Sequence, residues 1–581
     1  MILQALTEYY NALRASGAVI AAPGWGTAKI SFALYLREDG SLERVVSLQT
    51  EQPRGKKTVL APREDILVPR FLEERTSGTK SYFLCDNSEY ILGVDSTGKP
   101  ERALERFLNC KTLHEKILSA VDAPAARAVL AFFQSWEPEK AKEYPALAEH
   151  WEDILSGVNL VFHCAGGFAH EDPAVCAAWD RYYSQSGDGP EMVCLVTGEK
   201  GPIARLHPSI KGVINGKTMG NSLVSFNDSA YESYGCVKAQ GRNAPTSQYA
   251  AFAYTTALNY LLAHDRFQMG DASVVFWAKS GEEAYSDFYS SFFRQTYEEK
   301  DIREMVRELC KGHQVLYDET LLDPNMEFCV LGLSPNAARL SVRFFFRNSF
   351  GDFLKNIEAH RERLKIVRPA DEKYEVPSLE ALLDATVNQN TKGKQVSPEL
   401  AGEILRAVLN DTPYPASLLN GVVLRIRAER KISWPRAAIL KAYYLKKPNK
   451  DVPKEVLAVS LNEESTNVPY VLGRLFSVLE DIQQKANPSI NSTIKDKYFN
   501  SASSTPAVVF PGLVNLAQKH LKKLPEGRQR IFYEKQLQSI VSKLGEMYPA
   551  RLNLPQQGSF QLGYYHQTQS RYEKKEEKSN V

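Results

Sequence analysis

The hydrophobic pattern of this 581-residue chain changes near residue 377. Before that point, short apolar runs such as residues 160–162, 274–277 and 328–331 are separated by stretches with helical spacing. After it, apolar residues recur every three or four positions and strand-like runs fade. Because sheets and helices show different apolar periods, this order predicts an α+β protein, in which a large N-terminal mixed α/β portion is followed by a C-terminal all-helical bundle.

The same pattern divides the chain into four predicted parts. A domain holds about 150 residues on average, so a chain of this length has room for several. We expect an N-terminal α/β portion over residues 1–150 and a mixed-sheet portion with a polar loop over residues 151–376. A helical connector over residues 377–450 then leads to a helical bundle over residues 451–581.

Local spacing predicts individual elements within these parts. Helices are expected at residues 2–13, 101–121, 124–136, 350–364, 434–447 and 468–482, and from residue 506 onward. A hairpin is expected from residues 30–36 and 42–46, and a second extended pair from residues 82–84 and 90–92. The runs at residues 160–162, 192–196, 274–277, 328–331 and 340–346 are expected to form one mixed sheet.

Charge is distributed unevenly along the chain. The whole chain has 71 basic and 69 acidic residues, a net charge of +2. Residues 441–581 contain 21 basic and 13 acidic residues, a net charge of +8, which leaves −6 for residues 1–440. A basic C-terminal segment suits a polyanionic partner, although the whole-chain value conceals it.

Several protein classes are excluded by composition. The eight cysteines form no C-x-x-C pair, so neither a disulfide framework nor a zinc ribbon is predicted. No apolar run approaches the ~18 residues that span a bilayer. The first residues lack the basic start and apolar stretch of a secretory signal. We therefore expect a cytoplasmic protein.

No motif predicts a catalytic, metal or cofactor site. Gly216-Lys217-Thr218 resembles the end of a phosphate-binding loop, but Lys211 stands where that loop needs glycine. The pair His264-Asp265 could belong to a metal-dependent phosphohydrolase, which would need further ligands; a histidine closing a helix is the alternative. His163, Cys164, Cys176 and His207 match no compact zinc spacing.

The densest polar stretch is residues 225–245, which precede a predicted helix from about residue 246. Amide, hydroxyl and basic side chains on a glycine-punctuated loop can hydrogen-bond base edges and phosphates without titrating. Such groups suit recognition better than catalysis. A structural loop whose Asn and Ser residues bond their own backbone is an equal alternative.

The basic C-terminal segment has cations that could follow a phosphate backbone: Lys519, Lys522, Lys523, Arg528 and Arg530. Tyr533, Tyr564, Tyr565 and His566 are close to them in sequence and could stack on exposed bases. The alternative is a solvated helix face without a ligand.

Several stretches, in order along almost the whole chain, resemble one family: the large subunit of the type I-C CRISPR surveillance complex, Cascade. Each stretch is short, and their order makes the resemblance specific. They include residues 1–6, 23–25, 75–78, 83–87, 194–198, 207–212, 225–227, 233–235, 243–245, 333–336, 472–476, 501–503 and 563–567.

The resemblance implies a non-catalytic role in RNA-guided targeting of foreign DNA. Such a subunit reads a short protospacer-adjacent motif in duplex DNA, helps to start R-loop formation and contacts the guide's 5′ handle, while the guide RNA reads the target by base pairing. The implied partners are the guide RNA, the target double-stranded DNA, the backbone and handle-binding Cascade subunits, and a recruited helicase-nuclease. A metal-dependent nuclease using His264 and Asp265, or a scaffold that reads no motif, are the alternatives.

The resemblance also gives the two polar regions roles. We expect Asn243, Gln240, Lys238 and Asn227 to read the motif, with amide and lysine donors aimed at minor-groove acceptors. Phosphate contacts are expected from Arg242, Lys211 and the five C-terminal cations. Lys80 and Asn87 are second-rank candidates for contact with the guide or the DNA.

In this family the C-terminal helical portion can also be made as a separate small subunit by internal translation of the same gene. No methionine lies between Met326 and Met547, so such a start would need another codon. Val452, Val456, Leu457 and Val459 lie in the expected window. The fragment would contain roughly 120–130 residues, counted from that window to Val581.

Overall fold

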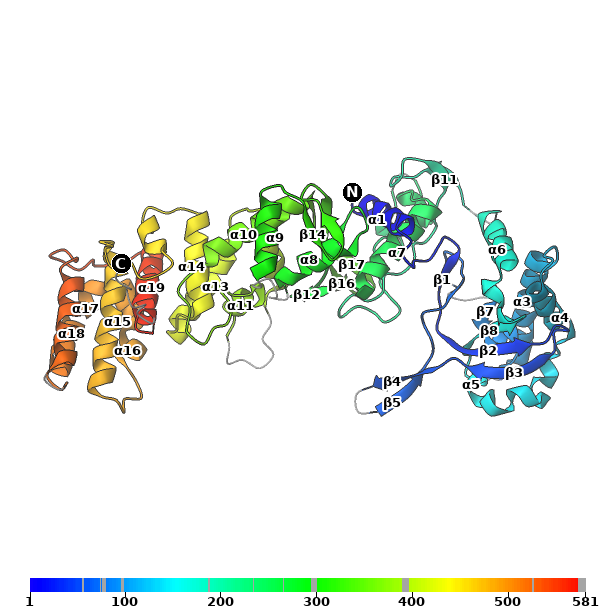
Figure 1. Ribbon diagram of the computed structural model, residues 1–581, viewed down its shortest axis with the longest axis horizontal. Coiled ribbons are helices and arrows are strands. Elements are labelled where there is room, and N and C mark those ends of the chain that lie inside the picture. Colours follow the sequence, from blue (N-terminus) through cyan, green and yellow to red (C-terminus); the bar gives the residue numbers. More distant parts are fainter. Residues whose placement is uncertain are drawn as a thin grey trace. The chain divides into compact units, whose positions relative to one another are not determined.

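A computed structural model describes residues 1–54, 57–73, 75, 80–95, 99–185, 189–233, 235–264, 266–293, 300–388, 396–524 and 527–572 (Figure 1). The chain divides into two compact units. Unit 1 contains residues 1–264 and 335–340, and unit 2 contains residues 265–334 and 341–581. Within the described residues, no helix combines the length and apolarity that crossing a membrane requires.

Unit 1 is built on a sheet with the strand order β3-β2-β8-β7, in which β2 and β8 run parallel and the other neighbours run antiparallel. Helices α3 and α4 pack beside this sheet, where Phe32, Phe132 and Phe162 share one buried core. The elements of this part are α1 (Ile2–Ala15), β1 (Trp25–Thr27), β2 (Ile30–Leu36), β3 (Leu42–Ser47), β4 (Thr50–Arg54), β5 (Lys57–Ala61), β6 (Leu67–Pro69), β7 (Cys85–Asn87), α2 (Ser88–Ile91), α3 (Pro100–Leu118), α4 (Pro124–Ser135), α5 (Trp151–Leu155), β8 (Asn159–Cys164), β9 (Gly167–Phe168) and α6 (Pro173–Gln185).

The rest of unit 1 holds the polar loop. This part of unit 1 begins with the short hairpin of β10 (Glu191–Val193) and β11 (Lys200–Pro202) and ends with helix α7 (Gln248–His264). The loop itself contains two single-turn 3-10 helices, η4 (Ser229–Tyr231) and η5 (Gln240–Asn243). Helix α7 packs against α1, so the loop is fixed to the first helix of the chain.

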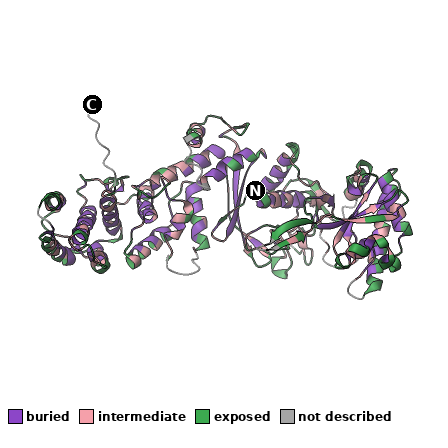
Figure 2. Ribbon diagram, turned by 60° about the horizontal axis from the view of Figure 1, so that its bottom comes forward, coloured by how far each residue is buried: buried purple, intermediate pink, exposed green. Residues whose placement is uncertain are grey.

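Unit 2 starts from a four-stranded sheet in the order β12-β13-β16-β17, with α10 following directly. The core that covers this sheet continues without a break into the C-terminal helices, whose inward faces are buried (Figure 2). The elements are β12 (Phe267–Met269), β13 (Ala272–Ala278), α8 (Glu283–Phe293), α9 (Lys300–Cys310), β14 (Val315–Tyr317), β15 (Thr320–Leu322), β16 (Glu327–Asn336), β17 (Arg339–Ser349), α10 (Phe350–Leu364), α11 (Leu379–Asp384), α12 (Pro398–Leu409), α13 (Ala416–Glu429), α14 (Trp434–Lys446), η7 (Lys454–Leu457), α15 (Val468–Ala486), α16 (Ile494–Ser504), α17 (Pro506–Leu521), α18 (Arg528–Val541) and α19 (Leu554–Gln569).

The predicted fold class is confirmed: strands and helices mix in the N-terminal portion, and the C-terminal portion is helical from α11 to α19. Two local predictions are wrong. The second extended pair is β7 followed by helix α2, because Asn87 caps a helix that begins at Ser88. Residues 160–162 belong to the sheet of unit 1, whereas residues 274–277, 328–331 and 340–346 form the sheet of unit 2. Of residues 192–196, only 192–193 are in a strand, β10, which pairs with β11 in a separate hairpin, so one shared sheet does not exist.

Candidate nucleic-acid interface

The polar loop is anchored by the tip of the β16–β17 hairpin, residues 335–340, which belongs to unit 1. The Ser222 amide donates to the Ala338 carbonyl at 3.1 Å, and the Leu340 amide donates to the Ser222 carbonyl at 3.0 Å. The buried Asn221 adds a bond from Nδ2 to the Ala337 carbonyl at 3.1 Å. The start of the loop is therefore paired with backbone more than 100 positions further along the chain.

Arg339 extends this anchor into the loop. Its guanidinium lies 3.9 Å from the ring centre of Tyr231 and donates to Oδ1 of Asn227. Asn227 is itself exposed. Because its oxygen is engaged by an arginine, its amide NH2 is the group that remains to donate outward.

The second half of the loop is held by Asn243. Its Oδ1 accepts from the Ser233 amide at 2.8 Å, and its Nδ2 donates to the carbonyls of Gln240 at 3.0 Å and Cys236 at 3.3 Å. Both ends of this side chain are thus used inside the loop. Asn243 therefore holds the loop in shape through three hydrogen bonds to its backbone.

Gln240 precedes Gly241, which packs so closely on the Ala204 backbone that only glycine fits there. A Cβ on Gly241 would lie 2.0 Å from the Ala204 carbonyl oxygen, so η5 packs directly on that backbone. Arg205 donates to Gln240 Oε1 at 2.9 Å and pairs with Glu73 at 2.6 Å. Gln240, like Asn227, has its oxygen on an arginine and its NH2 available for donation.

A tight turn around Cys194 supports the end of the loop. Its buried thiol accepts hydrogen bonds from the amides of Ser247 at 3.2 Å and Val196 at 3.4 Å. Burial raises the pKa of the thiol, but the hydrogen bonds from Ser247 and Thr197 outweigh it and lower that pKa to about 7. The Leu195 amide also donates to the Pro245 carbonyl at 2.8 Å. These bonds fix the chain where it enters α7.

Two cations of the loop are exposed on its surface. Lys238 and Arg242 are exposed, and their side chains make no hydrogen bond or ion pair with the residues that the structure describes. Lys238 and Gln240 have φ of +54° and +45°, a left-handed conformation that non-glycine residues adopt at a cost of order 1 kcal/mol and that often marks functional sites. Lys211 is also exposed, and its amide donates to Oδ1 of Asn259 on α7 at 2.8 Å.

The second-rank candidates lie in another part of unit 1. The Lys80 ammonium lies 4.3 Å from the ring centre of Phe71, and Asn87 accepts from the Glu89 amide as the cap of α2. Between them, the buried Asp86 carboxylate is bound by both terminal nitrogens of Arg75, at 2.8 and 2.9 Å. The region is therefore tightly built, and residues 76–78 of the associated motif lie outside the described residues.

The five C-terminal cations gather at one end of the bundle. Lys519 lies in the last turn of α17, Lys522 and Lys523 follow that helix, and Arg528 and Arg530 lie in the first turn of α18. Four of them are exposed, and Arg530 is paired with Glu534 at 3.0 Å. Sequence reasoning missed Lys485, which ends α15 at the same place, since Asn487 contacts both His520 and Lys523. Only the folded bundle brings that lysine to this end.

Burial excludes the stacking considered for Tyr533, Tyr564, Tyr565 and His566, because all four are at most 5% exposed. Tyr564 donates to Glu480 at 2.6 Å, and Tyr533 donates to Asp481 at 2.8 Å. Burial lowers the pKa of His566 to about 3, so it is neutral in the core. These residues join α19 and α18 to α15.

Two stretches of the sequence resemblance pack on each other in this bundle. Gly473 of α15 lies against the Phe560 carbonyl, where a Cβ would come within 1.9 Å of the oxygen. Gly563 of α19 lies against the Tyr470 carbonyl, where a Cβ would come within 2.1 Å. The two helices thus cross with their backbones in contact.

The motifs considered for catalysis form a turn and a helix end. Gly216 and Lys217 form a turn closed by Val213 and Asn221, and the next helical element is η4. His264 ends α7 with Nδ1 2.9 Å from the Tyr260 carbonyl, while Asp265 lies outside the described residues. Within the described part of the chain, no group of three or more His, Cys, Asp or Glu residues could hold a metal ion.

Comparison with known proteins adds one positive result. The family model described as CRISPR-associated protein (Cas_Csd1) matches residues 6–572, nearly the whole chain. No curated protein matches the chain.

Proposed function

The chain belongs to the Cas_Csd1 family of CRISPR-associated proteins, a family of Cascade large subunits, and from this membership we propose that it reads the protospacer-adjacent motif in duplex DNA. In a cytoplasmic type I-C complex it would also start R-loop formation and contact the guide's 5′ handle. Guide RNA, backbone and handle-binding subunits would surround it, and a recruited helicase-nuclease would cut the DNA. The subunit itself would be non-catalytic.

One observation carries the assignment of motif reading to the polar loop. Arg339 and Arg205 occupy the amide oxygens of Asn227 and Gln240, so these side chains and Lys238 present hydrogen-bond donors. The minor groove offers acceptors at adenine N3 and thymine O2, which donors of this kind can read. Arg242 and Lys211 would hold the phosphates beside that groove.

We expect Lys238→Ala to weaken binding to a correct-motif duplex by about 5-fold or more, because a base contact is worth roughly 1–3 kcal/mol. Arg242→Ala should weaken correct and incorrect motifs alike and flatten the dependence of affinity on salt. Binding titrations of the assembled complex at fixed salt measure both effects. Equal losses on correct and incorrect motifs for Lys238→Ala would remove that residue from motif reading.

The groove can be identified from the DNA side. Replacing motif adenine by 3-deazaadenine removes the minor-groove acceptor, whereas 7-deazaadenine removes the major-groove acceptor. We expect only the 3-deaza duplex to bind the complex more weakly. A loss confined to the 7-deaza duplex would place the loop in the major groove.

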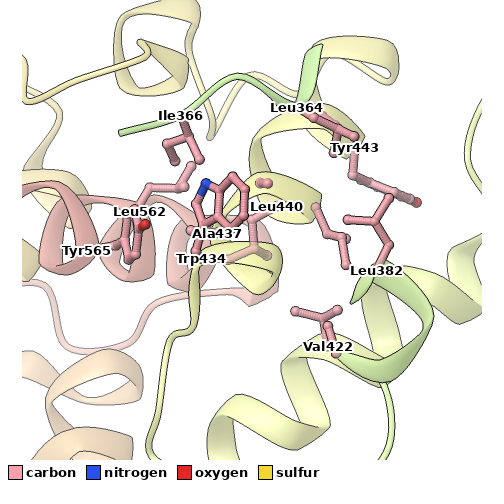
Figure 3. Close-up of a cluster of buried hydrophobic side chains, with 14 of the residues drawn as sticks. Leu364, Ile366, Leu382, Val422, Trp434, Ala437, Leu440, Tyr443, Leu562 and Tyr565 are labelled. Atoms are coloured by element: carbon pink, nitrogen blue, oxygen red, sulfur yellow. The ribbon is translucent and has the colours of Figure 1, made fainter. Parts of the chain in front are cut away.

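We also propose that the C-terminal helices are made separately as the small subunit. In the full chain, Trp434 of α14 lies beside Leu562 and Tyr565 of α19 (Figure 3). Tyr565 further donates to the Val367 carbonyl at 2.7 Å. A fragment that starts between Val452 and Val459 would leave this face of α19 uncovered, and the face would be free to bind a neighbour in the complex.

The uncovered face gives a direct comparison between two fragments. We expect a fragment that starts at Ser433, and so keeps α14, to unfold at a higher temperature than one that starts at Val452. Burial of Leu562 and Tyr565 side chains is worth about 1.5–3 kcal/mol each, which corresponds to a difference of at least 5 °C. Equal midpoints in thermal unfolding would show that α14 adds nothing, and intact mass of the purified complex would show whether the shorter product exists.

A further inference from the structure

Helix α18 exposes an aromatic side chain at the basic end of the bundle. Phe532 is 56% exposed, although its neighbour Tyr533 is buried at 4%. The two rings meet edge to face, with centres 5.4 Å apart. An exposed phenyl ring on a rigid helix is thus available where the tyrosines considered from sequence are not.

Cations flank this ring on the same helix. Arg528 lies four residues before Phe532 and Lys535 lies three residues after it, which are spacings that bring side chains together on a helix surface. Both cations are exposed, and the nearby Glu534 is paired with Arg530. Among the described residues, no ion pair compensates Arg528 or Lys535, so a purely apolar protein contact at this ring would have to desolvate two positive charges.

We infer that Phe532 is a stacking platform for an unpaired base of single-stranded DNA, with Arg528 and Lys535 on the flanking phosphates. Base–aromatic stacking beside a basic track is how proteins bind single strands without reading sequence. The inference rests on the proposed function for its source of ligand, since opening a duplex releases one strand. It assigns that strand to the exposed side of α18.

The full-length chain and a labelled oligothymidine test the ring directly. We expect Phe532→Ala to weaken binding by about 5- to 100-fold, the range measured for loss of one base stack, and Phe532→Trp to keep the affinity. Ile531→Ala is the matched control, because Ile531 is 52% exposed and has the same flanking charges. Equal losses for Phe532→Ala and Ile531→Ala, or no loss for Phe532→Ala, would overturn the inference.

Salt dependence separates stacking from charge. Phe532→Ala should leave the slope of log affinity against log salt unchanged, whereas Lys535→Ala should reduce it by about 0.7, the value for one phosphate of a single strand. If Phe532→Ala by itself changed this slope, the ring would act through its charged neighbours, and that result would contradict stacking.

The assembled complex identifies the strand. We expect Phe532→Ala to weaken binding to an opened duplex that carries the displaced strand, and to leave binding to the target strand alone unchanged. Equal weakening of both would assign the ring to another strand and overturn the inference. Motif preference should stay intact in this variant, so a complex without motif preference would contradict the proposed function while the Phe532 comparison remained interpretable.

Discussion

Gly473→Ala is expected to be among the most destabilising single substitutions in the C-terminal bundle. The new Cβ would lie 1.9 Å from the Phe560 carbonyl oxygen, so α15 and α19 must separate along their line of contact. Overpacking a fixed core costs about 1–3 kcal/mol, and a clash with backbone belongs at the upper end. We expect the unfolding midpoint of the bundle to fall by roughly 10 °C in thermal denaturation followed by circular dichroism.

Gly563→Ala should behave in the same way, because its Cβ would lie 2.1 Å from the Tyr470 carbonyl oxygen. Gly512→Ala is the matched control in the same bundle. Gly512 lies inside α17, is exposed and has no atom near its Cβ position, so alanine should stabilise that helix by about 0.5–1 kcal/mol. If Gly473→Ala and Gly512→Ala gave similar midpoints, the close crossing of α15 and α19 would be wrong.

Gly241→Ala is expected to remove motif-dependent DNA binding while the fold survives. Its Cβ would lie 2.0 Å from the Ala204 carbonyl oxygen, so η5 must lift away and take Gln240 out of reach of Arg205. Loss of at least one base contact should weaken binding to the correct motif by an order of 10- to 100-fold. The same titrations with incorrect motifs should change little.

Gly201→Ala is the control for that experiment. Gly201 lies in β11, which leads into the same loop, and no atom lies near its Cβ position. We expect this variant to bind as the unmutated complex does. Retained motif preference in Gly241→Ala would show that the packed conformation of η5 is not needed for reading.

Hydrophobic spacing and capping residues predicted fewer than half of the α-helices that the structure describes. The apolar faces and caps of α3, α4, α10, α14, α15 and α17 are local features, so their starts could be predicted to within a few residues. Strand partners could not be predicted, because pairing depends on residues far away. Residues 160–162 and 274–277 have similar composition, yet they lie in different sheets.

The candidate site could be predicted only in part. Composition identified the loop of residues 225–245, but it could not show which of its side chains make hydrogen bonds within the loop. Asn243 was ranked with the base readers, and only the fold shows that Ser233, Cys236 and Gln240 use it. Arg339 was missed because it reaches the loop from a hairpin more than 100 residues away.

The aromatic residues of the basic end show the same limit. Tyr533 and Phe532 are adjacent in sequence, so a count of aromatics near cations cannot separate them. Helical geometry turns one ring into the core and the other to the surface, at 4% and 56% exposure. The sequence did not show which side of α18 packs on α15.

We propose that the polar loop of this subunit reads a short motif in duplex DNA. Binding of the assembled complex to a duplex library with a randomised motif, at one stated salt concentration, tests it most directly. We expect a few motifs to bind at least 10-fold more tightly than the rest, and Gly241→Ala to erase the difference. Affinity that is the same for every motif, or a preference unchanged by Gly241→Ala, would contradict it.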